Sequence, residues 1–426
     1  MIEQIANGNT NHKAQSRLIS FGIGLLMIYA LLGVSDVPFH GDESTILYMS
    51  NDWFILREQG ISALYYRTLP LNALAQELRL VNGTLAPFSY GLMLETAGIA
   101  QSALNDAWDW SADWWENQYY GHFPRPEVLF IGRWTSALAL CLALSLSFAA
   151  GRLLIGAPNA FLATLIVGLA PAVLLNARRA MFEGVALLGA ALVWLAAARL
   201  VAGKARIGDW TLLGVACGLA LAAKHTSLLL IAPVFVALLW YGRACSLRTL
   251  SRLALAATIT SALFLLLNPS WWSEPLHVPR EVLRLRSATL TVQNELFGRP
   301  LRLHERLEAL IAFPFGAPQY FEDTRYAWRE WLADSIRGYE RGLQGVTWYA
   351  AAPLVYFVLL IGALTLRRER AGALLGIVLL GIGSALLLTN TLMWQRYYLL
   401  LTFPLAMLAA LGLARAARTV RIFRRA

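Results

Sequence analysis

Two adjacent carboxylates, Asp42 and Glu43, follow the first long apolar run of the chain, residues 18–34. They lie in the stretch FHGDESTILYMSND, residues 39–52, where GDEST has the pattern of a helix start. Carboxylates in a first turn accept free backbone N–H groups and suit the helix dipole, so the pair could simply cap this helix. A carboxylate at a membrane face can also act as a general base towards a hydroxyl group. This stretch alone leaves both interpretations open.

Charged side chains also interrupt apolar sequence at three turns that are far apart in the chain. These turns are NARRAMFEG (176–184), AAKHTS (222–227) and MWQRYYLLLTFP (393–404). A charge deep in a bilayer costs roughly 2.5–3.5 kcal/mol, so we expect these groups at the membrane edge or in a polar cavity. The candidate residues are Glu183, Arg178, Arg179, Lys224 and Arg396. The alternative for each turn is a charged side chain at a helix end that snorkels towards water.

The composition is that of an integral membrane protein. Of 426 residues, 58% are hydrophobic and 15% are charged, and the mean hydropathy is +0.53. Many apolar runs are long enough to cross a hydrocarbon core of roughly 30 Å. We predict an all-α polytopic membrane protein with about ten transmembrane helices and with juxtamembrane helices in two long outer loops. The predicted spans are 18–34, 131–150, 158–176, 180–198, 210–223, 227–242, 250–267, 347–366, 371–388 and 397–414.

Lysine and arginine are distributed unevenly between the two sides of these spans. An even number of crossings places both termini on one side, which then carries 17 of the 36 basic residues and 3 of the 26 acidic ones. Positive-inside bias makes this side cytoplasmic. The net charge of +10 is therefore a topology signal, and no nucleic-acid partner is expected. Because no small-residue cleavage site follows 18–34, we expect this first helix to be retained.

We predict one integral unit, 1–426, whose long loops both lie on the outer side. The first outer loop, 35–130, contains the Asp-Glu pair, an apolar helix at about 85–104 and a tryptophan-rich segment, 106–127. The second outer loop, 268–346, is aromatic-rich and of mixed charge. We expect the helix at 85–104 to lie at the interface, because an eleventh crossing would place the arginine-rich loops outside. Function is then expected on the outer face.

Acids and bases at one membrane face suit a substrate with a lipid tail and an anionic head, such as a polyprenyl phosphate that carries one sugar. A carboxylate would deprotonate the acceptor hydroxyl as it attacks the anomeric carbon. The departing phosphate needs no general acid, only arginine and lysine to match its charge. One base and one in-line displacement predict inversion at the anomeric carbon.

The order of these motifs resembles a known family. HGDESTILYM is similar to the Asp-Glu motif of the C-type membrane glycosyltransferases, in particular the group of protein O-mannosyltransferases and lipid A aminoarabinose transferases. The likeness continues through the interfacial helix, IGRWTSALALCLALSLSFAAGRLLIG, RRAMFEG, LAAKHTS and RYYLLLTFPLAMLAALG. It extends over most of the chain and depends on the order and placement of the motifs rather than on any single one.

The resemblance implies that Asp42 is the general base and that Glu43 supports it. Glu183 corresponds to the acid of a further outer loop, which is usually aspartate in relatives, and Lys224 and Arg396 look like donor-phosphate contacts. We include Arg178 and Arg179 among the candidate phosphate-binding residues because they are cations at the same face. The chain departs from the family before the interfacial helix, where NGTLAP replaces a His-Pro-Pro or Lys-Pro element. A phosphate or metal contact expected there is missing.

No cofactor is expected. His40 and His122 could approach the three acids and hold a divalent metal, but their spacing matches no recognisable ligand set, and a monophosphate donor does not require a metal ion.

The sequence predicts an inverting glycosyltransferase that moves a monosaccharide from a polyprenyl-phosphate donor to a glycan, lipid or protein acceptor. We expect it in a bacterial inner or plasma membrane, with its site on the periplasmic or extracellular side. The main alternative is a transporter or flippase of lipid-linked saccharides, which would carry its functional charges nearer the bilayer midplane. A catalytically silent partner-binding subunit and an oligosaccharide ligase with a pyrophosphate-linked donor are further alternatives.

Overall fold

The computed structural model describes residues 2–203, 205–241, 246–297, 300–322, 327–347, 352–366 and 370–423. Every regular element in these ranges is a helix. The prediction of an all-α polytopic membrane protein is confirmed. Six basic residues of the charge count lie outside the described residues: Lys204, Arg243, Arg367, Arg368, Arg424 and Arg425.

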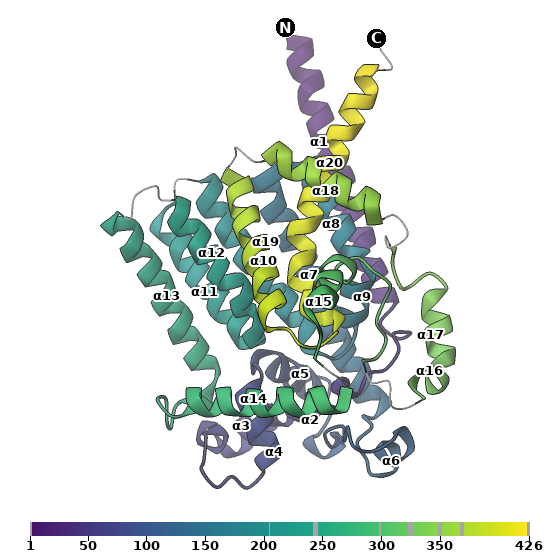
Figure 1. Cartoon of the computed structure of the whole chain (residues 1–426), viewed down its shortest axis with the longest axis vertical. Coiled ribbons are helices and arrows are strands. Elements are labelled where there is room, and N and C mark those ends of the chain that lie inside the picture. The colour runs from purple at the N-terminus through teal and green to yellow at the C-terminus, as the bar shows by residue number, and fades with distance from the viewer. Residues whose placement is uncertain are drawn as a thin grey trace.

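Long apolar helices run side by side in a bundle, and both termini project from the same end of it (Figure 1). Among the described residues, six helices are long and apolar enough to cross a membrane. They are α1 (Ile2–Leu32), α7 (Pro126–Ile155), α10 (Phe182–Ala202), α13 (Leu247–Leu267), α19 (Arg370–Thr389) and α20 (Thr402–Phe423), the last continuous with the 3₁₀ helix η6 (Gln395–Leu401). Three shorter apolar helices match further predicted spans: α11 (Ile207–Ala223), α12 (Leu228–Tyr241) and α18 (Ala352–Leu366).

The predicted span 158–176 is not one straight helix. The chain forms α8 (Ala157–Gly168) and α9 (Pro171–Arg178), which meet at an angle of 62°. Pro171 has no N–H to continue the hydrogen-bond ladder of α8, but it suits the first turn of a new helix. The bend directs the carboxyl end of α9, which carries Arg178, into the protein.

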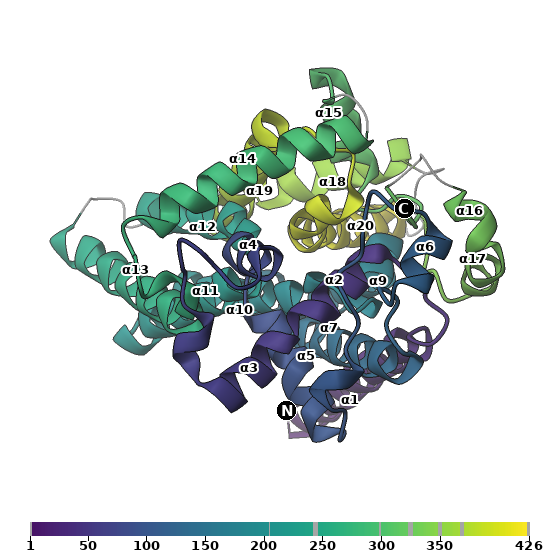
Figure 2. The same cartoon turned by 90° about the horizontal axis from the view of Figure 1, so that it is seen from below.

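The end of the bundle opposite the termini is covered by short helices of the first outer loop, and α14 of the second outer loop lies across this face (Figures 1 and 2). The first outer loop forms α2 (Gly41–Met49), α3 (Asn51–Gln59), α4 (Ala73–Val81), α5 (Leu85–Thr96) and α6 (Trp114–Tyr119), with the 3₁₀ helices η1 (Ile61–Leu64) and η2 (Gln101–Ala103). The second forms η4 (Pro269–Trp271), α14 (Val278–Phe297), α15 (Leu303–Ala312), α16 (Trp328–Trp331) and α17 (Ala333–Glu340). The turn η3 (His225–Ser227) joins α11 to α12.

The helix predicted at 85–104 ends earlier than expected, at Thr96. Gly98 then turns the chain with a φ of +77°, which favours glycine. The 12 residues of α5 span about 18 Å, too short to cross a membrane. The prediction of a juxtamembrane helix is confirmed, because α5 packs with α3, α7 and α10 below the bundle (Figure 1).

A close backbone approach connects the first outer loop to the bundle. A Cβ atom on Gly83 would lie 2.2 Å from the carbonyl oxygen of Ala222, so only glycine fits there. The turn between α4 and α5 therefore rests on the end of α11, next to Lys224. A second close approach seats Gly41, the first residue of α2, on the indole ring of Trp108.

Candidate functional site

The first turn of α2 separates the two adjacent carboxylates. His40 is the N-cap, and its Nδ1 accepts the backbone N–H of Asp42 at 3.1 Å. Glu43 completes a capping box, because its Oε2 accepts the backbone N–H of His40 at 3.1 Å. The helix start is therefore capped by His40 and Glu43, which leaves the carboxylate of Asp42 outside the capping box.

Glu43 is buried and fully bonded. Its side chain is 0% exposed, and Arg133 of α7 donates two hydrogen bonds to it, at 2.8 and 2.9 Å. The backbone N–H of Ala180 donates a further bond at 2.9 Å. A buried, bidentate ion pair of this kind orients the groups that make it. Glu43 thus fastens the first turn of α2 to α7 and to the turn after α9.

Asp42 faces outward and pairs with a residue far along the chain. Its side chain is 22% exposed and accepts a hydrogen bond from Nη1 of Arg396, in η6. Arg396 also lies over the ring of Trp394, 4.5 Å from its centroid. Nε of Arg396 lies 3.8 Å from Oε1 of Glu322, in the second outer loop. The structure brings together the predicted base and one predicted phosphate-binding cation.

Glu322 also contacts His40, whose Nε2 lies 2.5 Å from Oε2 of this carboxylate. The Glu322 side chain is 7% exposed. Burial alone would raise the pKa of Glu322, but the nearby Arg396 and His40 lower it to about 2. Glu322 is therefore ionised at neutral pH, and Arg396 is held between two carboxylates.

Glu183 and Lys224 form a second ion pair near the first. Nζ of Lys224 lies 2.5 Å from Oε1 of Glu183, and the same ammonium lies 5.9 Å from the ring centroid of Tyr397. Oε2 of Glu183 is buried and has no hydrogen-bond partner among the described residues. Because Tyr397 follows Arg396 directly, this pair lies close to the pair of Asp42 and Arg396 at η6.

A further cation reaches this group from α14. Arg286 is partly buried, donates a hydrogen bond to the carbonyl of Val81, and lies within electrostatic range of Tyr397. Burial lowers the pKa of Arg286. Within the part of the chain that the structure describes, no carboxylate lies at ion-pair distance from Arg286. Its charge is thus the least compensated of the cations in this group.

Arg178 and Arg179 pair with none of Asp42, Glu183 and Glu322 at ion-pair distance among the described residues, although Arg179 lies within electrostatic range of Glu43 and Glu322. Both are fully buried. Nε of Arg178 donates to the carbonyl of Ala30 at 2.8 Å, and its Nη1 donates to the hydroxyl of Tyr339 at 2.8 Å. Arg179 donates to the carbonyl of Pro38 at 2.9 Å and to that of Tyr320 at 2.6 Å. These guanidinium groups join α1, α9 and the second outer loop, and they leave no open approach for a phosphate.

Aromatic rings form a wall that runs from the tryptophan-rich segment towards η6. The ring centroids of His40 and Trp110 are 5.8 Å apart, those of Trp110 and Phe297 are 5.6 Å apart, and those of Phe297 and Trp394 are 5.4 Å apart. Trp394 in turn carries Arg396 on its face. The wall therefore connects both outer loops beside the ion pairs.

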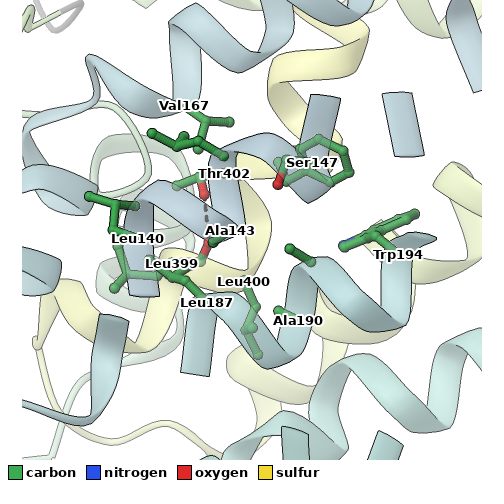
Figure 3. Close-up of a pocket in the computed structure, with 13 residues that line it drawn as sticks. Leu140, Ala143, Ser147, Val167, Leu187, Ala190, Trp194, Leu399, Leu400 and Thr402 are labelled. Atoms are coloured by element: carbon green, nitrogen blue, oxygen red, sulfur yellow. Dashed lines mark hydrogen bonds between the residues drawn. The ribbon is translucent and has the colours of Figure 1, made fainter. Parts of the chain in front are cut away.

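The cavities differ in what they could hold. Figure 3 shows a cavity between α7, α10 and η6, lined by residues such as Leu140, Trp194 and Leu400; its volume is about 20 Å³. That is room for about one water molecule. An open depression of about 480 Å³ lies instead beside Arg133, with Asp36 and Trp331 among its lining residues. Only the second has the size of a sugar-binding pocket.

The described residues contain no group of three His, Cys, Asp or Glu side chains that could hold a metal ion. His122, a candidate ligand in the sequence, instead contacts the carbonyl of Ala107 through its Nδ1.

Sequence reasoning missed three residues of the site: Arg133, Arg286 and Glu322. Arg133 had a usable signal, because it is an arginine at the start of a long apolar helix and such a charge requires a partner. Glu322 and Arg286 lie in a mixed-charge loop, where a charged residue is ordinary.

The sequence matches no protein-family model and no curated protein sequence. The fold resembles that of ArnT, an aminoarabinose transferase from Cupriavidus metallidurans. Two crystal structures of ArnT, one bound to undecaprenyl phosphate and one apo, give TM-scores of 0.54 and 0.53 at 14% identity, and cover 94% of this chain and 60% of ArnT.

The archaeal oligosaccharyltransferase AglB from Archaeoglobus fulgidus, in complex with an inhibitory peptide and a dolichol-phosphate, gives a TM-score of 0.50 at 11% identity, covering 95% of this chain and 51% of AglB. This chain therefore spans about half to three fifths of the length of these proteins. At these identities the likeness establishes the fold alone.

Proposed function

We propose that this protein is an inverting membrane glycosyltransferase that moves a monosaccharide from a polyprenyl-phosphate donor to an acceptor hydroxyl. The observation that carries the proposal is the placement of Asp42, a partly exposed carboxylate outside the capping box and paired with Arg396. Lys224 and Arg286 lie around the neighbouring Tyr397. A base beside several cations is what transfer from a lipid phosphate requires.

In the proposed reaction, a carboxylate oxygen of Asp42 takes the proton of the acceptor hydroxyl. The acceptor oxygen forms a bond to the anomeric carbon as the bond from that carbon to the phosphate oxygen breaks. The developing charge on the phosphate is met by Arg396, Lys224 and Arg286. Because one carboxylate acts in one displacement, the product has the inverted anomeric configuration.

We assign supporting roles to the other two predicted acids. Glu43 holds the first turn of α2 in place through Arg133, and so fixes the position of Asp42. Glu183 orients Lys224. We leave Arg178 and Arg179 outside the donor site, because their hydrogen bonds go to buried carbonyl and hydroxyl groups.

The fold likeness supports a lipid-phosphate donor, since ArnT has been crystallised with undecaprenyl phosphate and AglB with a dolichol-phosphate. The charge distribution supports a site on the non-cytoplasmic face, with both termini in the cytoplasm. The depression beside Arg133 has the size of a small-ligand site, but its lining residues include none of Asp42, Arg396 and Lys224.

The test uses purified protein in lipid with a panel of labelled polyprenyl-phosphate sugars and a mixture of glycan, lipid and peptide acceptors. We expect release of free polyprenyl phosphate together with a new glycosidic bond of inverted configuration. Movement of the label across a vesicle membrane without a new glycosidic bond would identify a flippase instead and overturn the proposal.

A further inference from the structure

Glu322 occupies an unusual position for a residue of a long outer loop. It reaches back to the first turn of α2, where its Oε2 lies 2.5 Å from Nε2 of His40. Its other oxygen lies 3.8 Å from Nε of Arg396. One buried carboxylate thus contacts both the N-cap residue of the helix that carries Asp42 and the cation that pairs with Asp42.

The hydrogen bonds determine the tautomer of His40. Nδ1 accepts the backbone N–H of Asp42 at 3.1 Å, so this nitrogen carries no hydrogen. The ring hydrogen is therefore on Nε2, which donates it to Glu322. The ring connects Glu322 to the backbone of Asp42. Four residues form a closed ring of contacts: His40, Asp42, Arg396 and Glu322.

Arg396 has two carboxylate partners of different accessibility. The side chain of Asp42 is 22% exposed, whereas that of Glu322 is 7% exposed. An anion that arrives from the lipid side can displace the more exposed partner, because that carboxylate can regain hydration. The buried carboxylate cannot leave without becoming an unsolvated charge.

We propose that Glu322 is a positioning residue that retains Arg396 when the donor phosphate displaces Asp42 from it, which frees Asp42 to act as the base. This inference rests on the proposed function. In the structure the carboxylate of Asp42 is engaged by Arg396. Binding of the donor would therefore activate the base.

The charged and titratable groups that face Asp42 among the described residues come from three segments. His40 and Glu43 lie on its own helix start, Arg396 and Tyr397 on η6, and Glu322 on the second outer loop. Without the charge of Glu322, Arg396 would act on Asp42 alone. The whole charge of Arg396 would then act on the carboxylate of Asp42, so the acid limb of the pH–rate profile should move to lower pH.

The experiment compares the variant Glu322→Gln with the wild type, both in lipid. The matched control is Glu330→Gln, because Glu330 is an exposed residue of the same loop. We expect kcat to fall by about 10-fold or more and the acid limb of the pH–rate profile to move down by about one pH unit. The Kd for undecaprenyl phosphate should stay within about 3-fold of wild type or tighten, because the variant removes a negative charge near the phosphate. Glu322→Asp, which keeps the charge, should restore the position of the acid limb.

An unshifted acid limb, or a Kd that weakens by the same factor as kcat falls, would overturn the proposal and leave Glu322 a structural or donor-binding residue. If Glu322→Gln does not fold, the ¹⁵N chemical shifts of the His40 ring in the wild type test the proposal instead. The His40 signals are those that disappear in His40→Gln. The neutral ring with hydrogen on Nε2 is expected, and a ring protonated on Nδ1 would contradict the proposal. The Kd and the chemical shifts can be measured without turnover. Failure of the proposed function would appear as no turnover of any donor by the wild type, which is a different result from failure of this inference.

Discussion

Asp42 and Glu43 are neighbours in the sequence, and each pairs with an arginine, yet their surroundings differ. Glu43 is fully buried and bonded by Arg133 and by two backbone N–H groups. Asp42 is partly exposed, and its arginine is shared with Glu322. A carboxylate that is fixed therefore differs from one that can change partners in its exposure and in the number of groups that compete for its arginine, and not in its residue type.

The cations divide in the same way. Arg178 is enclosed by carbonyl groups and by the rings of Tyr29 and Tyr339, so its charge is committed to the fold. Lys224 pairs with one carboxylate, and Arg286 pairs with none among the described residues. Only the second kind can exchange its present contacts for a phosphate at small cost.

The largest effect on stability is expected where the buried pair is broken. Glu43→Gln leaves Arg133 buried without its counter-charge, which should lower the free energy of unfolding by about 3–5 kcal/mol. Thermal unfolding in detergent or lipid measures this, with the exposed Glu330→Gln as control.

The double variant Glu43→Leu/Arg133→Leu sharpens this prediction. It leaves no unpaired charge, so it should be less destabilised than either single variant. A double variant that loses the sum of the two single effects would show that the pair is not coupled.

A smaller effect is expected at the exchangeable cations. Lys224→Ala, Arg396→Ala and Arg286→Ala should each weaken binding of undecaprenyl phosphate about 10- to 100-fold, because each removes a charge-assisted contact of about 1.5–3 kcal/mol. Titration of each variant with the lipid measures the Kd. Unchanged affinity in Arg286→Ala would remove that residue from the donor site.

The contrasting variant is Arg178→Gln. We expect a lower midpoint of thermal unfolding and a Kd for undecaprenyl phosphate within about 3-fold of wild type, because the guanidinium bonds the fold and not the donor. A large loss of lipid affinity in a variant that remains folded would return Arg178 to the donor site.

The sequence was informative where apolar length or charge placement constrained the answer. The spans followed from hydropathy, and Lys224 and Arg396 were found because a lone cation at a turn between apolar helices requires a partner. The partners themselves were not predictable. Arg178 and Arg396 are both arginines at the ends of apolar helices. Only the packed structure shows that Arg178 donates to carbonyl groups whereas Arg396 pairs with a carboxylate. Glu322 had no periodic or apolar context to mark it.

The smallest effect is expected from pH acting on Glu322. Its pKa is lowered from 4.5 to about 2 in the folded protein, so the charged form stabilises the fold. This stability is fully present above the unfolded value and is lost as the pH falls towards about 2. The difference in unfolding free energy between wild type and Glu322→Gln should therefore shrink between pH 4.5 and pH 3. Thermal unfolding at these two pH values and at pH 7 tests this, and a difference that grows on acidification would contradict it.

The most direct test of the central claim compares donor turnover by wild type, Asp42→Asn and the control Asp106→Asn, an exposed residue of the same outer loop. The account predicts that Asp42→Asn loses turnover by about 10²- to 10⁴-fold while it remains folded and binds undecaprenyl phosphate, and that Asp106→Asn resembles wild type. Full turnover in Asp42→Asn would contradict the account, because the carboxylate beside Arg396 would then be only part of the helix start.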